Sequence, residues 1–144
     1  MFLGEYLHTF DTKNRISLPS KFRKELGRVI IVTRGLDHCL YIYAKKEWER
    51  EALKYADRAS GDAANRGLAR LFLAGSSEAD VDGAGRVLIP DHQKEFAQLK
   101  KNVVFTGVSD HVEIWDAFRW KSYKARIEKD AERMATKLGE IGAL

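Results

Sequence analysis

The chain has 144 residues, of which 44% are hydrophobic and 32% charged, and its formal net charge at pH 7 is +4. This composition favours a globular protein over a disordered one, and no apolar run approaches the roughly 20 residues of a membrane-spanning helix. A single cysteine, Cys39, excludes an intrachain disulfide and a cysteine-based zinc site, and the N-terminus does not resemble a signal peptide. We therefore expect a cytoplasmic protein without a membrane partner.

The first unit of the chain, residues 5–47, is predicted to be mainly β. Residues 5–10 alternate in polarity, as expected for a strand, and we expect this strand to pair with the next one as a hairpin with Lys13 and Asn14 at its tip. Ser20 is placed to cap a short helix that Gly27 closes. The predicted elements are strands at 5–10 and 16–18, a helix at 21–26, and strands at 29–33 and 40–43.

Residues 48–75 are predicted to be a helical connector. Helical spacing of apolar residues begins at about residue 45 and continues to about 58, and it resumes over 65–73. Ser60, Gly61 and Asp62 separate the two helices.

The second unit, residues 76–119, repeats the first. Residues 82–90 match residues 11–19, because each stretch has an aspartate, three turn-forming or polar residues, an arginine, three strand-like residues and a proline. Strands are expected again at 102–106 and 112–115. Two units that match over about 44 residues indicate an internal duplication, which is best stabilised when the copies pack against each other.

Residues 120–144 are predicted to form an amphipathic helix that starts near Asp116. Its apolar residues recur at steps of three and four. A core-facing helix is favoured over a cofactor or membrane surface, and a subunit-packing helix is a version of that interpretation. The apolar positions are Trp120, Tyr123, Ile127, Ala131, Met134 and Leu138.

No motif in the sequence indicates catalysis, a cofactor or a small-molecule substrate. Asp37-His38 and Asp110-His111 occupy corresponding turns, where both residue types are ordinary. Phosphate-binding loops, zinc-binding helices and nucleophile elbows are absent. We therefore expect neither an enzyme nor a metal site.

The repeated aspartate and arginine suit a turn that carries a DNA contact. Asp11 and Asp82 can accept amide hydrogens of their turns, and Arg15 and Arg86 present a planar fork that fits a guanine edge or a phosphate. An ion pair that only fixes the turn is an equal alternative from spacing alone. Asn14 and Gly85 stand at matching positions and tolerate positive φ, which predicts a left-handed residue in each turn.

The two copies of the repeat differ in net charge. Residues 11–28 contain six basic and two acidic residues, a net of +4, whereas residues 82–99 contain two basic and three acidic residues, a net of −1. We expect Lys13, Lys21 and Arg23 to surround Arg15 with positive charge and to contact phosphates. Arg86 is expected to be a weaker second contact.

The residues resemble the MraZ family of bacterial transcriptional regulators, which have two SpoVT-AbrB-type domains. The resemblance rests on Met1–Gly4, His8 and the two Asp-x-x-x-Arg-x-x-x-Pro motifs, and it covers the whole chain. It implies an α+β fold with a mainly β core, in which two AbrB-like swapped-hairpin units form an intrachain pseudo-dimeric barrel with added helices. Two departures stand out, since Asn14 replaces a usual glycine and Leu3 stands where a basic residue is expected.

The resemblance also implies a function. It predicts a nucleoid-associated regulator that binds double-stranded DNA at short repeated sites through Arg15 and Arg86. The expected targets are its own promoter and a division and cell-wall gene cluster, and the chains are expected to close into a ring-shaped homo-oligomer. Two alternatives stay open from the residues: an RNA-binding regulator using the same basic face, and an antitoxin-like protein-interaction module.

Overall fold

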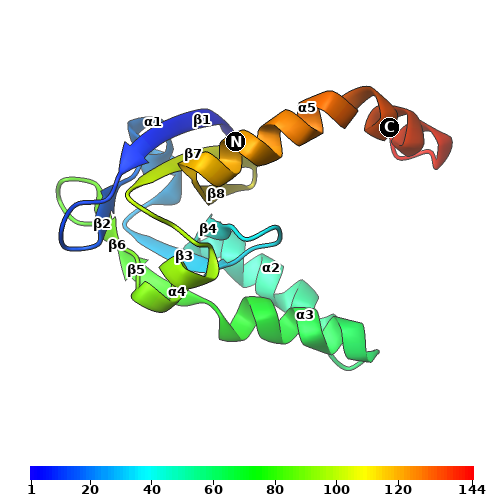
Figure 1. The fold of residues 1–144 in the computed structure, drawn as a ribbon. Coiled ribbons are helices and arrows are strands. Elements are labelled where there is room, and N and C mark those ends of the chain that lie inside the picture. The colour runs from blue at the N-terminus through cyan, green and yellow to red at the C-terminus, as the bar shows by residue number, and fades with distance from the viewer.

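The computed structural model describes the whole chain, Met1–Leu144, as eight strands and five helices (Figure 1). The strands gather at one end of the molecule, α2 and α3 lie together below them, and α5 projects away. The elements are β1 (Phe2–Thr9), β2 (Arg15–Ser17), α1 (Ser20–Leu26), β3 (Val29–Arg34), β4 (Leu40–Ala44), α2 (Lys45–Arg58), α3 (Ala63–Ala74), β5 (Ser77–Asp80), β6 (Arg86–Leu88), α4 (Asp91–Phe96), β7 (Asn102–Ser109), β8 (His111–Asp116) and α5 (Ala117–Glu140).

The two units exchange strands. Six strands form an antiparallel sheet in the order β1-β7-β8-β4-β3-β5, and β2 and β6 form a separate antiparallel ribbon. The first strand of each unit pairs with a strand of the other unit, β1 with β7 and β5 with β3, while β4–β8 and β2–β6 join equivalent strands. The chain therefore has an internal pseudo-two-fold arrangement, which confirms the predicted swapped-hairpin units. The closed barrel stays a prediction.

The local hairpin expected between residues 5–10 and 16–18 is wrong. All eight residues of β1 pair with β7, from Phe2 opposite Ser109 to Thr9 opposite Asn102. In β2, Ile16 lies opposite Val87 of β6, and both side chains are 1% exposed. Pairing across the units buries both apolar side chains at once, and this burial outweighs the shorter loop of a local hairpin.

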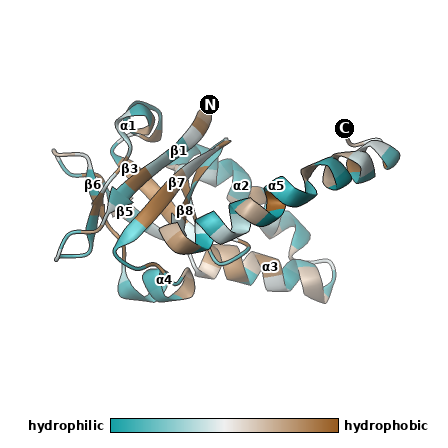
Figure 2. Cartoon of the chain, turned by 45° about the horizontal axis from the view of Figure 1, so that its top comes forward, coloured by the Kyte–Doolittle hydropathy of each residue, from teal (hydrophilic) through white to brown (hydrophobic).

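One core joins the two units. It contains 18 buried hydrophobic residues from the inner face of the six-stranded sheet, the ribbon and α1, with the brown strands of Figure 2 at its centre. A smaller cluster of Ile31, Tyr43, Trp48 and Phe72 fixes α2 and α3 to the outer face. Cys39 is fully buried, as expected of a core thiol, and burial raises its pKa above the ordinary value.

One of the two predicted helix caps is confirmed, and the other is wrong. Ser20 was expected to cap α1, but it is the first helical residue, and Pro19 precedes it with no side-chain cap. Proline has no side-chain acceptor, and its carbonyl instead accepts a hydrogen bond from the Phe22 N–H at 2.9 Å. Asp116 caps α5 as predicted, since its carboxylate accepts a hydrogen bond from the Arg119 N–H at 3.2 Å.

The expectation that α5 faces the core holds only for its beginning. Trp120 and Tyr123 pack on Trp115 with ring centroids 5.3 and 4.8 Å apart, and Lys124 Nζ lies 2.9 Å from Glu5 Oε1. From Ala131 onward every residue is exposed, because the helix has left the sheet. No helix of the chain is both long enough and apolar enough to span a membrane.

Candidate nucleic-acid interface

The two Asp-to-Arg turns have the same internal hydrogen bonds. In the first, Asp11 Oδ1 accepts from the N–H groups of Lys13 and Arg15 at 2.8 and 3.0 Å, and Arg15 Nε donates to Asp11 Oδ2 at 2.8 Å. In the second turn, Asp82 accepts the equivalent three bonds from Ala84 and Arg86, each at 2.9 Å. The aspartate therefore closes the turn and holds the guanidinium with the same carboxylate.

This arrangement leaves the outer part of each guanidinium available. The side chains of Arg15 and Arg86 keep 32% and 36% of their surface exposed, and their terminal nitrogens donate no hydrogen bond within the chain. Hydrogen bonds from the Arg15 backbone lower the pKa of Asp11, and those from the Arg86 backbone lower that of Asp82. Each carboxylate thus stays ionised, and the ion pair orients a fork that still has free donors.

The ribbon carries one turn at each of its ends, and both turns lie on the same side of the molecule. Arg15 pairs with Leu88, Ile16 with Val87 and Ser17 with Arg86. Leu18 N–H donates to the Gly85 carbonyl at 2.9 Å, and Ile89 N–H donates to the Asn14 carbonyl at 3.2 Å, which extends the pairing to the turns themselves. Figures 1 and 2 show the two loops projecting together from one end of the molecule.

Left-handed residues occupy the predicted positions. Asn14 has a φ of 59° and Gly85 a φ of 79°. Asn14 is held from the other unit, since Lys94 Nζ donates to its Oδ1 at 2.7 Å and its Nδ2 donates to Asp91 Oδ1 at 3.0 Å. Each turn is therefore braced by the helix of the opposite unit.

The structure corrects the predicted position of Arg23. This side chain was expected beside Arg15, but its guanidinium lies over Gly85 of the second turn, where an added Cβ would meet Arg23 Cζ at 2.4 Å. Arg23 Nε also donates to the Leu18 carbonyl at 2.9 Å. The reason is the strand exchange, which places α1 next to the turn that follows β5. Positive charge from the first unit therefore surrounds the second arginine turn.

A positively charged hollow lies between α1 and the second turn. It has a volume of about 480 Å³, and its basic residues all come from the first unit. Lys13 and Lys21 are exposed on the first turn and on α1. The hollow is lined by Arg23, Lys24, Gly27, Arg28, Val81, Asp82, Gly83 and Gly85.

Sequence reasoning missed the contact of Lys94 with the first turn, and it counted Lys24 and Arg28 toward the first turn instead of the second. It grouped basic residues with the turn that is nearest along the chain, whereas the exchange of strands places them beside the turn of the other unit. The pseudo-two-fold pattern of the repeat was the signal that could have revealed this, because a swapped hairpin places each unit's helix beside the other unit's turn.

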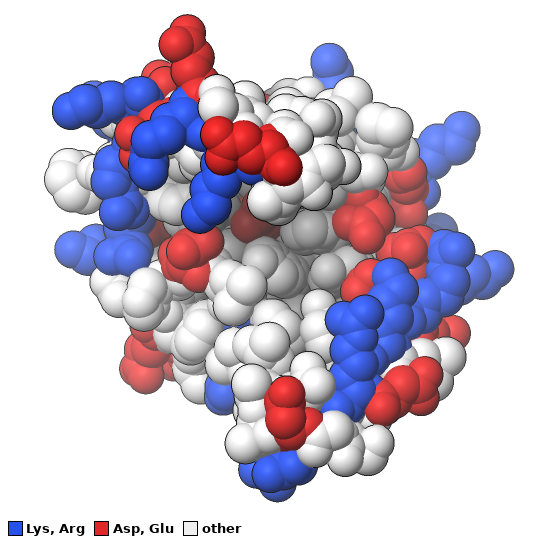
Figure 3. All heavy atoms as spheres, turned by 90° about the vertical axis from the view of Figure 1, so that its right-hand side faces the viewer, with Lys and Arg blue, Asp and Glu red and all other residues white.

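The opposite side of the molecule has mixed charge. Figure 3 shows a band of Lys and Arg side chains there, with Asp and Glu side chains beside it. On α2, Arg50 pairs with Glu47, and Lys54 Nζ lies 2.6 Å from Glu51 Oε1. Both basic side chains are therefore paired with a carboxylate of the same helix.

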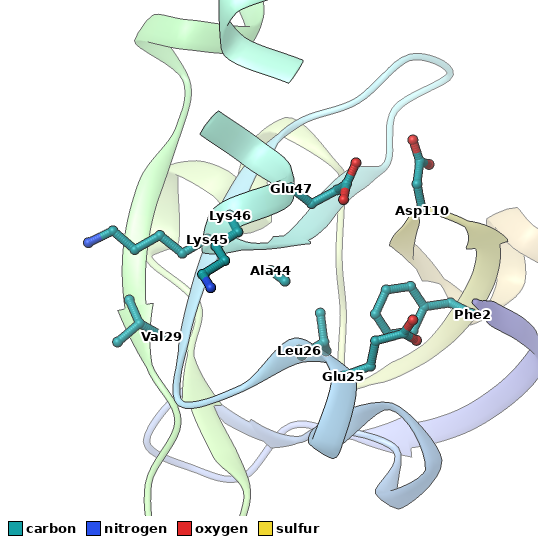
Figure 4. A pocket seen from close by; sticks show the side chains of 9 residues that line it. All are labelled: Phe2, Glu25, Leu26, Val29, Ala44, Lys45, Lys46, Glu47 and Asp110. Carbon is teal, nitrogen blue, oxygen red and sulfur yellow. The ribbon is translucent and has the colours of Figure 1, made fainter. Parts of the chain in front are cut away.

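A second hollow of the molecule has its positive and negative side chains on different sides. It has a volume of about 380 Å³ and lies between the end of α1 and the start of α2 (Figure 4). Its lysines, Lys45 and Lys46, lie on one side, and the carboxylates of Glu25, Glu47 and Asp110 lie on the other. Lys45 Nζ is paired with Glu78 at 2.8 Å. No group of three or more His, Cys, Asp or Glu side chains is placed to hold a metal ion.

Comparison with known proteins agrees with the duplicated architecture. The family model described as "MraZ protein, putative antitoxin-like" matches residues 1–71 and again residues 72–138. The chain belongs to the MraZ family. The family resemblance noted from the two motifs is thereby confirmed.

Individual relatives match over almost their whole length. A protein of Carboxydothermus hydrogenoformans is 46% identical over 140 residues, covering 93% of this chain and 96% of the relative. Proteins of Acetivibrio thermocellus and Clostridium tetani are 43% and 45% identical, and each comparison covers 99% of both chains. All three relatives are named "Transcriptional regulator MraZ".

Proposed function

We propose that this MraZ chain binds double-stranded DNA at specific sequences and regulates transcription, without catalysing a reaction. The relatives' names say that they are transcriptional regulators. The observation that supports DNA binding is the pair of oriented arginines, Arg15 and Arg86, at the two ends of one two-stranded ribbon. A ribbon of this kind fits the major groove of B-DNA, where arginine forms two hydrogen bonds to a guanine.

The surrounding charges suit phosphate contacts. Lys13 and Lys21 are exposed near the first turn and on α1, while Arg23, Lys24 and Arg28 line the hollow at the second turn. Such contacts fix the position of a protein on a duplex without distinguishing its bases. Because Arg86 has this basic neighbourhood, we propose that it contributes to binding as much as Arg15.

The structure favours duplex DNA over single-stranded RNA as the partner. Sequence-specific RNA binding relies on exposed aromatic rings that stack on bases. The aromatic residues nearest the turns are turned inward, since Phe10 and Phe22 are buried and the Lys94 ammonium covers the Phe10 ring at 4.4 Å.

Selection of bound duplexes from a random DNA pool tests the proposal. A short enriched sequence is expected, and Arg15→Ala and Arg86→Ala should each weaken binding to it by about 1–3 kcal/mol and relax its specificity. Lys21→Ala should weaken binding to all sequences alike and reduce the dependence on salt. A pool without enrichment, or normal binding by both folded arginine variants, would refute the proposal.

Arg50→Ala is a matched control for the arginine variants. Arg50 is exposed on the mixed-charge side and pairs with Glu47. Its loss should leave both affinity and specificity unchanged. Competition by single-stranded RNA and co-purification of a stoichiometric second protein would instead indicate the RNA-binding and antitoxin-like alternatives.

The targets follow from the same selection. We propose that the enriched sequence occurs as short repeats upstream of the chain's own gene and a division and cell-wall gene cluster, so that the protein works at the nucleoid. Chromatin precipitation from growing cells should recover these regions. Recovery of no DNA would contradict this part of the proposal.

We also propose that copies of the chain associate, as a ring. The projecting half of α5 supports this, because Met134 is 38% and Leu138 42% exposed on a helix without a partner in its own chain. With Ile127, Ala131 and Leu144 they line a hollow of about 410 Å³. Several ribbons on one assembly would raise the affinity for repeated sites through effective concentration.

Sedimentation of the intact protein tests the association. A mass of several chains is expected, and Leu138→Glu should reduce it. Thr136→Glu is the matched control, since Thr136 is exposed on the opposite face of the same helix. A wild-type mass of one chain at micromolar concentration would refute the association.

A further inference from the structure

The outward face of the ribbon carries four side chains. Strand alternation turns Ile16 and Val87 inward, where both are 1% exposed, and turns their neighbours outward. Cross-strand pairing gives two outward pairs, Arg15 with Leu88 and Arg86 with Ser17. Partners in an antiparallel ladder lie on the same face, so each arginine has one defined neighbour.

Leu88 is unusual in this setting. It is 55% exposed, although it lies between buried residues, Val87 and Ile89, in one of the two strands that carry the arginine turns. A single exposed leucine needs no explanation on an ordinary surface. Here, however, it is the direct cross-strand partner of Arg15. A leucine beside an arginine presents an apolar contact next to a hydrogen-bonding fork.

In the major groove these two chemistries have distinct partners. Arginine matches the two acceptors of guanine, and an apolar side chain matches the C5 methyl group of thymine. We propose that Leu88 contacts the methyl group of a thymine adjacent to the base that Arg15 contacts. This inference rests on the proposed DNA binding and adds a specificity-determining residue to it.

The pairing also makes the interface asymmetric. Arg86 lies beside Ser17, whose hydroxyl can donate and accept hydrogen bonds, so the second arginine has a polar neighbour where the first has an apolar one. The pseudo-two-fold backbone thus carries two different recognition pairs. The sequence bound by one chain is therefore not a palindrome.

Replacing thymine with deoxyuridine tests the inference, because it removes only the methyl group. Each thymine of the selected duplex is replaced in turn, and binding is measured with the wild type and with Leu88→Ala. At one position next to the Arg15-contacted base, the wild type should lose affinity about two- to five-fold, the effect of burying a single methyl group. Leu88→Ala should bind the thymine duplex about as weakly and show no further loss with deoxyuridine.

Controls separate the possible outcomes. Leu36→Ala removes a leucine of similar exposure, 48%, far from the ribbon in sequence and should keep the full methyl effect. Thermal melting and sedimentation should show Leu88→Ala folded and unchanged in mass. A change in mass without a change in methyl dependence would place Leu88 in a contact between chains and overturn the inference.

Failure of the inference and failure of DNA binding give different results. If duplexes bind in an Arg15-dependent way, but no thymine is methyl-sensitive or Leu88→Ala keeps the sensitivity, only the role of Leu88 is wrong. If the selected sequence has no thymine beside the base that Arg15 contacts, only the role of Leu88 is again wrong. If no duplex is bound, or Arg15→Ala binds normally, both proposals are wrong. Leu88→Ser, which gives both arginines a serine neighbour, should enrich a sequence that lacks the thymine.

Discussion

The first and second arginine turns share their hydrogen bonds and differ in what lies against them. Asn14 in the first turn is held by Lys94 and Asp91, whereas Gly85 in the second lies beneath Arg23. A similar difference separates the helices that follow, since Phe22 fills the core in α1 and the equivalent Gln93 in α4 is buried with its Nε2 hydrogen-bonded to Val32 O and Gly75 O. The hydrogen bonds within the turn are therefore the same in both copies, whereas the residues that pack against the turn differ.

Removing one unit altogether should have the largest effect. A fragment of residues 1–75 retains the first turn but loses β6, β7 and β8, which pair with β2, β1 and β4. Its core residues would be exposed, so we expect no cooperative unfolding transition and no folded spectrum. Circular dichroism and denaturant titration measure this. A fragment that unfolds cooperatively would show that the units are independent domains.

Gly85→Ala should distinguish the two turns next most strongly. The new Cβ would force the end of the Arg23 side chain to move away from Gly85, and the φ of 79° is unfavourable for alanine. We expect a loss of about 2 kcal/mol in the free energy of unfolding. Asn14→Gly makes the opposite exchange and should change stability by less than about 1 kcal/mol, because glycine accepts the left-handed backbone. Equal effects of the two substitutions would contradict the difference in bracing.

Much of the fold could be predicted from the sequence because local patterns dictate it. The turn aspartates, the left-handed Asn14 and Gly85 and the Asp116 cap all depend on residues close in the chain. The hairpin partner of β2 and the position of Arg23 could not be predicted this way. Both depend on which strand is nearest in space, and strand alternation is the same for a local and an exchanged hairpin.

The site shows the same limit. The pairing of Arg15 with Asp11 follows from a spacing of four residues, whereas the pairing of Arg15 with Leu88 requires the register between two units. The net charge counted along the chain predicts an acidic second turn. Strand exchange places Arg23, Lys24 and Arg28 beside it.

Arg23→Met and Lys94→Met compare the two braces directly. Arg23→Met removes the hydrogen bond to the Leu18 carbonyl and should cost about 1 kcal/mol of stability. Lys94→Met keeps an apolar stem beside Phe10 but loses the bond to Asn14, so we expect about 0.5 kcal/mol. Chemical denaturation of both variants gives these values. A larger effect of Lys94→Met would reverse the proposed order of the braces.

Low pH should reduce the stability contributed by both turns by similar amounts, and this is the smallest of the expected effects. Folding lowers the pKa of Asp11 and of Asp82 below the ordinary value of 3.8, mainly through backbone hydrogen bonds. A lowered pKa adds stability above the unfolded pKa, and this stability is lost as the pH falls through the folded pKa. Denaturant unfolding between pH 7 and pH 2.5 should therefore show a decline below about pH 4 that is shallower in Asp11→Asn and Asp82→Asn, and by similar amounts. A decline that is unchanged in Asp82→Asn alone would show that the second carboxylate is not held as the first one is, because equal hydrogen bonds require equal proton linkage.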